Sequence, residues 1–248
     1  MKIAKRPFNL KYFLNNLKDD TYVTYIFIAI NVIVFLVAAV LGVAGLANTY
    51  GAAPAFEMSG VHLAVQSELV FQAGQWWRLF TAMFGHFGLV HIALNCVTIY
   101  FFGRQIENLY GHARFTIIYL VSGIVGNAAA LGFSAPGTWS AGASTSVFGL
   151  FGAMIVLYRY FRDNPQIRQM SRQLMSLVIM NIVIDLMIPG ISLAGHIGGF
   201  IGGILVGAAL AIKGHEHRYN VHERILAGIF TVFVIAVSLY VAYRRSVG

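Results

Sequence analysis

Charged residues are scarce in this chain of 248 residues. Asp, Glu, Lys and Arg make up 10% of the sequence, hydrophobic residues make up 58%, and the mean hydropathy is +0.72. So few charges exclude a water-soluble globular domain, in which about a quarter of the residues are charged. So much apolar sequence excludes an intrinsically disordered chain, and a single cysteine excludes a disulfide scaffold. The composition instead predicts an all-α polytopic membrane protein.

Seven apolar stretches are long enough, or nearly so, for helices that cross a hydrocarbon core of about 30 Å. They run from Thr21 to Ala47, between Leu79 and Gly103, from Phe115 to Phe133, Gly142 to Tyr158, Leu174 to Ile188, Ile191 to Ile212 and Ile225 to Tyr243. The first is too long for a cleaved signal peptide, so we interpret it as a retained anchor. We expect a basic cytoplasmic tail (1–20), a six-helix core (21–213), and a loop with a seventh helix (214–248).

The basic residues predict the orientation of these helices. With the N-terminus in the cytoplasm, 14 of the 17 Lys and Arg residues fall inside, and only Arg78, Arg244 and Arg245 fall outside. Lys and Arg are enriched in cytoplasmic loops, so we interpret the net charge of +8 as a signal that orients the membrane helices. No recognition motif accompanies it, and we expect no nucleic-acid partner. The short basic tail, without a transit peptide, favours a bacterial plasma membrane.

The connection from Asn48 to Leu79 is the longest and lies on the outer side. It ends in Gln75-Trp76-Trp77-Arg78. Tryptophan is enriched at headgroup depth. The sequence therefore leaves two interpretations open: a loop lying partly in the outer leaflet, or an ordinary aromatic belt.

Three polar groups interrupt the apolar spans, where polar side chains cost free energy and by default mark functional sites. They are His86, His91 and Asn95 in the second span, Gly142-Ala143-Ser144-Thr145-Ser146 at the start of the fourth, and Gly195-His196 in the sixth. At about 1.5 Å per residue from the cytoplasmic ends, Ser144 and His196 both fall in the outer third of the membrane. Asn95 reaches the same depth if its helix continues to Leu109. Glycines at 195, 199, 203 and 207 provide a face for close helix packing.

These side chains could perform acyl transfer. A serine hydroxyl needs a base such as neutral imidazole, and the reaction needs donors for the developing oxyanion. The unpaired N–H groups at the start of the fourth span could supply such donors, with the Asn95 amide and the His91 ring. Each residue also has a structural explanation: membrane serines bond to their own helix, histidines pair with neighbours, and asparagines join helices.

The motifs resemble those of the rhomboid intramembrane serine proteases. The resemblance rests on His86-x4-His91-x3-Asn95, Gly142-Ala143-Ser144, Gly195-His196-x2-Gly199-x3-Gly203 and Trp77-Arg78, and it spans about Trp76 to Gly207. It implies a six-helix core, here followed by one C-terminal transmembrane helix. It also implies Ser144 as nucleophile and His196 as general base, a dyad without a carboxylate, and an oxyanion hole from the Ser144 N–H, Asn95 and His91. We expect no cofactor and no metal.

The resemblance further implies a water-filled cavity that opens outward and is capped by a loop at about Pro189 to Leu193. Substrates would be single-span or membrane-anchored proteins, cleaved in or near a transmembrane segment close to the outer face of the bilayer. A competing hypothesis is an inactive rhomboid-like protein that binds transmembrane segments. A third is a haem or ion-conducting bundle that uses His86, His91 and His196.

Several residues depart from the motifs or carry a second interpretation. Thr145 stands where the family commonly has glycine, and Phe148, at a position often tyrosine, could stack against His196. Asp185 could orient His196 as a third triad member, but we favour an interfacial or structurally paired acid because the family pattern supplies no such role. Ser146 is a second candidate nucleophile, but its side chain points about 200° away from that of Ser144 around the helix axis. Three histidines, His215, His217 and His222, have a loose metal-ligand spacing, but we interpret them as solvated residues of a cytoplasmic loop. We interpret Cys96 as a buried packing residue.

Overall fold

The computed structural model describes residues 21–43, 58–187, 191–212, 216 and 219–247, and this part of the chain is mainly helical. The expected basic tail lies outside these residues. The elements are α2 (Tyr22–Val43), α3 (Met58–Leu63), α4 (Ser67–Phe71), α5 (Arg78–Thr81), η3 (Ala82–Phe84), α6 (Leu89–Thr98), η4 (Ile99–Gly103), α7 (Arg104–Tyr110), α8 (His112–Phe133), α9 (Ser144–Phe161), α10 (Pro165–Met187), α11 (Leu193–Leu210) and α12 (Val221–Val247). An isolated antiparallel bridge joins Val65 to Ser140.

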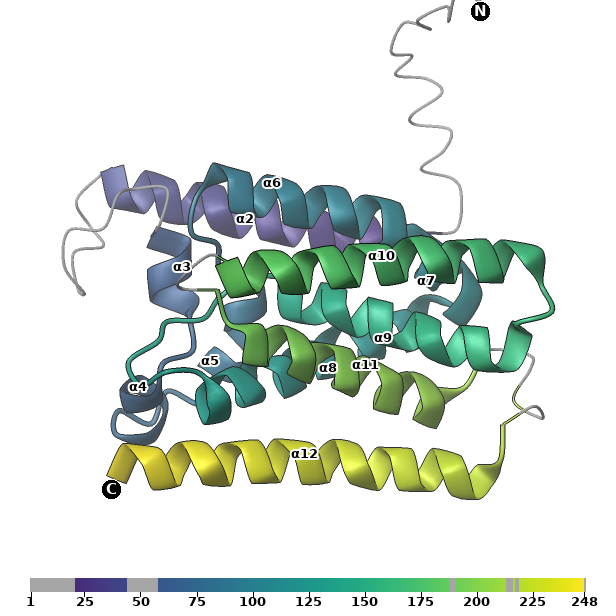
Figure 1. Ribbon diagram of the computed structural model, residues 1–248. Coiled ribbons are helices and arrows are strands. Elements are labelled where there is room, and N and C mark those ends of the chain that lie inside the picture. Colours follow the sequence, from purple (N-terminus) through teal and green to yellow (C-terminus); the bar gives the residue numbers. More distant parts are fainter. Residues whose placement is uncertain (1–20, 44–57, 188–190, 213–215, 217–218, 248) are drawn as a thin grey trace, which may run out of the picture.

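Seven helical stretches in the described chain are long and apolar enough to cross a membrane. They are Tyr22–Leu41, Leu89–Tyr110, His112–Phe133, Ser144–Phe161, Ile167–Met187, Leu193–Leu210 and Val221–Ser246. The long helices run side by side, and the short helices α3, α4 and α5 gather at one end of the bundle (Figure 1). The predicted all-α polytopic fold is confirmed, and the chain is an integral multi-pass membrane protein.

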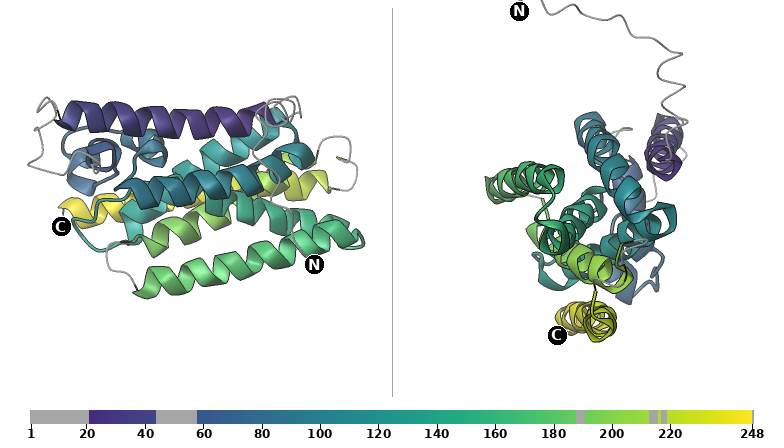
Figure 2. Two further views of the ribbon diagram at one scale, coloured as in Figure 1. Left: turned by 90° about the horizontal axis from the view of Figure 1, so that it is seen from above. Right: turned by 90° about the vertical axis from the view of Figure 1, so that its right-hand side faces the viewer.

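Helices α8, α9 and α11 form the centre of the bundle, whereas α2, α10 and α12 lie at its periphery (Figure 2). The glycines of α11 explain how closely it approaches α9. A Cβ atom at Gly203 would overlap the carbonyl oxygen of Gly149, and one at Gly199 would overlap that of Thr145. The predicted glycine face of the sixth span is thus confirmed as a close helix–helix contact.

The second predicted span, Leu79 to Gly103, was wrong at both ends. The apolar run after Arg78 forms the short elements α5 and η3, and Gly88, with φ +100°, precedes the first residue of α6. At the other end the helix continues through the π-helical turn η4 into α7 and ends at Tyr110. His86 therefore lies before the membrane helix. Asn95 lies in a helix that continues past Leu109, which is the condition for its predicted depth.

A buried carboxylate ties three elements together at the opposite end of the bundle from α3. Glu107 of α7 accepts hydrogen bonds from the backbone N–H groups of Val23 (3.1 Å) and Thr24 (2.8 Å) in the first turn of α2. It also pairs with Nδ1 of His112, the first residue of α8, at 2.7 Å. The first N–H groups of a helix have no acceptor within the helix and favour negative charge. Glu107 therefore caps α2 from a distant part of the sequence.

The seventh membrane helix is attached to the core at both ends. Near its start, Glu223 lies 3.3 Å from Arg159 of α9 and accepts a hydrogen bond from Tyr160 at 2.7 Å. Near its end, Arg245 donates to the Gly132 carbonyl of α8 at 2.7 Å. Between these points α12 lies along α8 and α11.

We expect Gly203→Ala to destabilise the protein by about 1–3 kcal/mol, because the added methyl group forces the α9 and α11 backbones apart. Gly228→Ala in α12 is the matched control, since a Cβ there meets nothing within 4 Å. Its stability should stay the same or rise slightly. Thermal unfolding in detergent micelles measures both, and equal Tm values for the two variants would contradict the close contact.

Candidate active site

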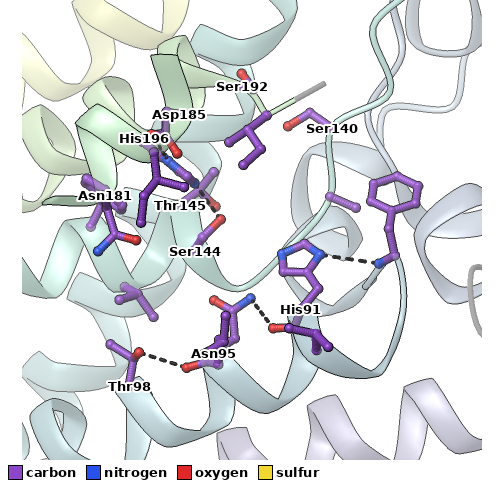
Figure 3. A pocket seen from close by; sticks show the side chains of 18 of the residues that line it. His91, Asn95, Thr98, Ser140, Ser144, Thr145, Asn181, Asp185, Ser192 and His196 are labelled. Carbon is purple, nitrogen blue, oxygen red and sulfur yellow. Dashed lines mark hydrogen bonds and ion pairs between the residues drawn. The ribbon is translucent and has the colours of Figure 1, made fainter. Parts of the chain in front are cut away.

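A cavity of about 880 Å³ lies among α6, α9, α10 and α11. Its polar lining residues are His91, Asn95, Thr98, Thr138, Ser140, Ser144, Thr145, Asn181, Asp185, Ser192 and His196, most of which are labelled in Figure 3. The remaining wall is apolar, and includes Leu94, Val147 and Phe151. The four residues predicted as the site, Ser144, His196, Asn95 and His91, therefore line one cavity.

Ser144 and His196 are hydrogen-bonded to each other. The distance from Ser144 Oγ to His196 Nε2 is 2.8 Å. Ser144 is the first residue of α9, where the N–H groups have no acceptor within the helix. His196 stands in the first turn of α11, whose N-terminus is capped by the Ser192 hydroxyl accepting from the Gly195 N–H at 3.0 Å. The predicted common depth of these two residues is confirmed.

The other ring nitrogen of His196 contacts Asp185. His196 Nδ1 lies 2.5 Å from Oδ2 of Asp185 on α10, and both side chains are buried. Asp185 is thus a paired acid that faces the cavity (Figure 3). This contact agrees with the expected structurally paired acid. Sequence reasoning could name the residue because few acids fall in the apolar spans, but it could not place α10 beside α11.

Phe148 covers one face of the His196 ring. The two rings are nearly parallel, with an interplanar angle of 7° and centroids 4.3 Å apart. The predicted stacking is confirmed. Together with the hydrogen bonds at its two nitrogens, this contact holds the imidazole between α9 and α10.

His91 and Asn95 form the α6 side of the cavity. The Asn95 side-chain amide donates to the His91 carbonyl at 3.0 Å, and the Phe87 N–H donates to His91 Nδ1 at 3.4 Å. An accepting Nδ1 means that the neutral ring carries its proton on Nε2. That atom lies beside Gly142, where a Cβ would approach it to 2.7 Å.

His86 supports the segment that leads into Ser144. Its Nε2 accepts from the Ala143 N–H at 3.4 Å, and its carbonyl accepts from the Ser59 hydroxyl at 2.9 Å. Burial, followed by the neighbouring His91, lowers the pKa of His86 to about 3. The ring is therefore neutral near pH 7 and acts as a hydrogen-bond acceptor outside the cavity lining.

Ser146 and Thr145 point into helix contacts. Ser146 Oγ lies 3.8 Å from the sulfur of Met83, on the side of α9 away from Ser144, as predicted. Thr145 also lines the cavity, but its side chain lies against Gly126 of α8 and Gly195 of α11.

Other candidates from the sequence fall elsewhere. His215 and His217 lie outside the described residues, and His222 is in the first turn of α12, with its N–H donating to the Asn220 side chain. The described residues contain no group of three metal-ligating side chains. Of the capping loop expected at Pro189 to Leu193, residues 189 and 190 lie outside the described chain, whereas Ile191 lines the cavity. Cys96 is a partly buried free thiol.

The fold and the cavity define a polytopic helical membrane protein with a hydrogen-bonded serine and histidine that line a largely apolar cavity. The family model of the Rhomboid domain matches residues 73–213, which include all four predicted site residues. The chain belongs to the rhomboid family.

Curated relatives agree with this family. The chain is 35% identical over 190 residues to rhomboid protease GluP of Bacillus subtilis (strain 168), covering 76% of this chain and 35% of the relative. It is 37% identical over 142 residues to RHOMBOID-like protein 7 of Arabidopsis thaliana, covering 56% and 44%. It is 31% identical over 138 residues to Rhomboid-like protease 3 of Toxoplasma gondii, covering 54% and 51%. The chain thus spans between about a third and a half of the length of these relatives.

Gly142→Ala should destabilise the site by about 1–3 kcal/mol, because Gly142 has φ +143° and the methyl group would press on His91 Nε2. Gly137→Ala is the control: φ there is +75°, but nothing lies within 4 Å of a Cβ. It should cost about 1 kcal/mol from the backbone alone. Thermal unfolding compares the two, and His91→Ala should relieve part of the Gly142→Ala loss. Equal losses at both glycines would argue against the His91 contact.

Proposed function

We propose that this protein is a serine endopeptidase that cleaves membrane-anchored proteins in or near a transmembrane segment. The observation that carries the proposal is the 2.8 Å hydrogen bond between Ser144 Oγ and His196 Nε2 in a cavity at the N-terminus of α9. Membership of the rhomboid family supports it, as does the similarity to a relative named rhomboid protease GluP.

In the proposed reaction His196 is the general base. Its Nε2 takes the proton of the Ser144 hydroxyl while Oγ bonds to the carbonyl carbon of the scissile amide. The protonated imidazole then gives the proton to the departing amine, and the acyl group stays on Ser144. A water molecule, deprotonated by His196, attacks this ester. The imidazolium then returns the proton to Ser144 Oγ as the acid is released, which restores both residues.

Three donors can stabilise the oxyanion of these steps. The Ser144 backbone N–H is at the start of α9, where it has no acceptor within the helix. The Asn95 amide has two N–H bonds, of which one donates to the His91 carbonyl and the other is available. The His91 ring carries its proton on Nε2, the atom nearest Gly142. Donors fixed before the reaction are worth several kcal/mol to a transition state that develops negative charge.

The cavity suits a stretch of polypeptide from a single-span or membrane-anchored protein. An amide within a helix is hydrogen-bonded and shielded, so helix-breaking residues near the cleavage site favour its entry. Under this proposal residues 21–213 form the catalytic core, the N-terminus is cytoplasmic, and the cavity faces the outer side of a bacterial plasma membrane. Arg159 lies in the last turn of α9, at the opposite end of that helix from Ser144, which agrees with this orientation.

The competing hypotheses explain fewer observations. An inactive protein that binds transmembrane segments has no need of a serine bonded to a histidine. A haem or relay site would use the ring nitrogens of His196, and both are already engaged by Ser144 and Asp185.

Replacing either member of the pair should abolish cleavage. In vesicles that contain a single-span substrate, Ser144→Ala and His196→Ala should each lower kcat by roughly 10⁴-fold or more, because the nucleophile or its base is lost. Ser146→Ala is the matched serine control and should cleave at the normal rate. Undiminished cleavage by Ser144→Ala and His196→Ala would rule out this mechanism, and a folded wild type that cleaves no substrate of a panel would favour the inactive relative.

A fluorophosphonate probe should identify the nucleophile without a known substrate. The wild type and Ser146→Ala should be labelled, whereas Ser144→Ala should not, because only an activated serine attacks the phosphorus. Gel fluorescence of purified protein measures the labelling. Equal labelling of Ser144→Ala would place the reactive serine elsewhere.

Asn95→Ala should lower kcat by roughly 10²–10³-fold with a smaller effect on KM, because an oxyanion donor acts in the transition state. The neighbouring Cys96→Ala is the control on the same helix and should retain the wild-type kcat. Steady-state cleavage in vesicles gives both constants, and a change confined to KM would contradict the donor role.

A further inference from the structure

We propose that Asp185 is a positioning residue for His196, so that this protein uses an Asp-His-Ser triad in place of the two-residue dyad that its motifs imply. This inference rests on the proposed function of the same site. It assigns a role to α10, which lines the cavity beside α9 and α11.

The three side chains form a series of contacts across three helices, in the order Asp185, His196, Ser144. Asp185 Oδ2 on α10 is 2.5 Å from His196 Nδ1 on α11, and His196 Nε2 is 2.8 Å from Ser144 Oγ on α9. Each imidazole nitrogen therefore has one partner, and the carboxylate is at the opposite edge of the ring from the nucleophile (Figure 3). This is the order of contacts that a serine triad requires.

Burial makes the contact an energetic necessity. The Asp185 side chain is 3% exposed and the His196 side chain 10%. Asp185 lies near the end of the apolar span Ile167–Met187, where an isolated carboxylate would be costly. A partner with an N–H lowers that cost, and His196 Nδ1 is the partner present. The carboxylate in turn selects the ring form with the proton on Nδ1, leaving Nε2 free to accept the proton of Ser144.

The triad also changes the charged intermediate. When Ser144 Oγ bonds to the substrate carbonyl, its proton moves to His196 Nε2 and the ring becomes a cation. The Nδ1–H stays on the ring and donates to Asp185, which remains ionised and stabilises the cation. The proton later leaves Nε2 for the departing amine, and the ring returns to its neutral form. Asp185 acts through His196 Nδ1 and does not bond to the reacting Oγ of Ser144.

Asp185→Asn tests the positioning role without changing the size of the side chain. Its amide would donate to Nδ1 and hold the proton on Nε2, the wrong ring form for a base. We expect kcat per folded molecule to fall roughly 10²- to 10⁴-fold with KM unchanged. Asp185→Glu restores the carboxylate and should recover part of kcat. Asp163→Asn, an exposed residue between α9 and α10, is the matched acid-to-amide control and should cleave as the wild type does.

Asp185→Leu is a second variant in case the amide prevents folding, because an apolar side chain with the same branching is often tolerated where a buried charge was. Thermal unfolding measures whether each variant folds. The kcat is then measured on the folded fraction. A kcat within about threefold of wild type in either folded variant would overturn the positioning role. So would a rise in KM alone, or a loss that Asp185→Glu does not relieve. Wild-type protein without Ser144-dependent cleavage would instead overturn the proposed function, and the triad with it.

Discussion

The backbone contact between α9 and α11 determines where the proposed catalytic side chains lie. Gly199 and Gly203 have no side chain to separate the helices, and the carbonyl groups of Thr145 and Gly149 occupy the space that a Cβ would need. Ser144 and His196 stand in the first turns of these two helices, so their hydrogen bond depends on the distance between the helix axes. A displacement of about 1 Å is enough to lower a catalytic rate by about 10²-fold. The many glycines of the chain thus serve the geometry of the site.

A second group of interactions fixes the opposite end of the bundle. Glu107 joins α2, α7 and α8, and the pair Arg159–Glu223 joins α9 to α12. The cavity end holds charged groups as well: Arg245 donates to the Gly132 carbonyl, and Asp185 pairs with His196. Because lipid offers no hydrogen bonds, each polar group within the bilayer must find its partner in the protein. Asp185 and Glu107 each pair with a histidine on a neighbouring helix, and Glu107 also accepts from the Val23 and Thr24 N–H groups of α2.

Much of this arrangement could be predicted from the sequence. Span length and the rise of 1.5 Å per residue located the seven helices and put Ser144 and His196 at one depth. The resemblance to the family indicated the Phe148 stacking. The start of α6 was wrong because Leu79 to Phe84 is as apolar as a membrane span, and only the backbone shows the break before Leu89. The Asp185 contact was left open because sequence periodicity gives depth and face but says nothing of which helices are lateral neighbours.

The π-helical turn at Ile99–Gly103 sets the rotational phase between the two halves of the second membrane helix. Asn95 and Glu107 are both buried, one beside the cavity and one at the far end. In an uninterrupted α-helix, at about 100° per residue, they would be about 120° apart around the axis. Five residues of π-helix, at about 82° each, reduce that angle to about 30°. One wider turn therefore lets a single helix present both residues to the interior from nearly the same face.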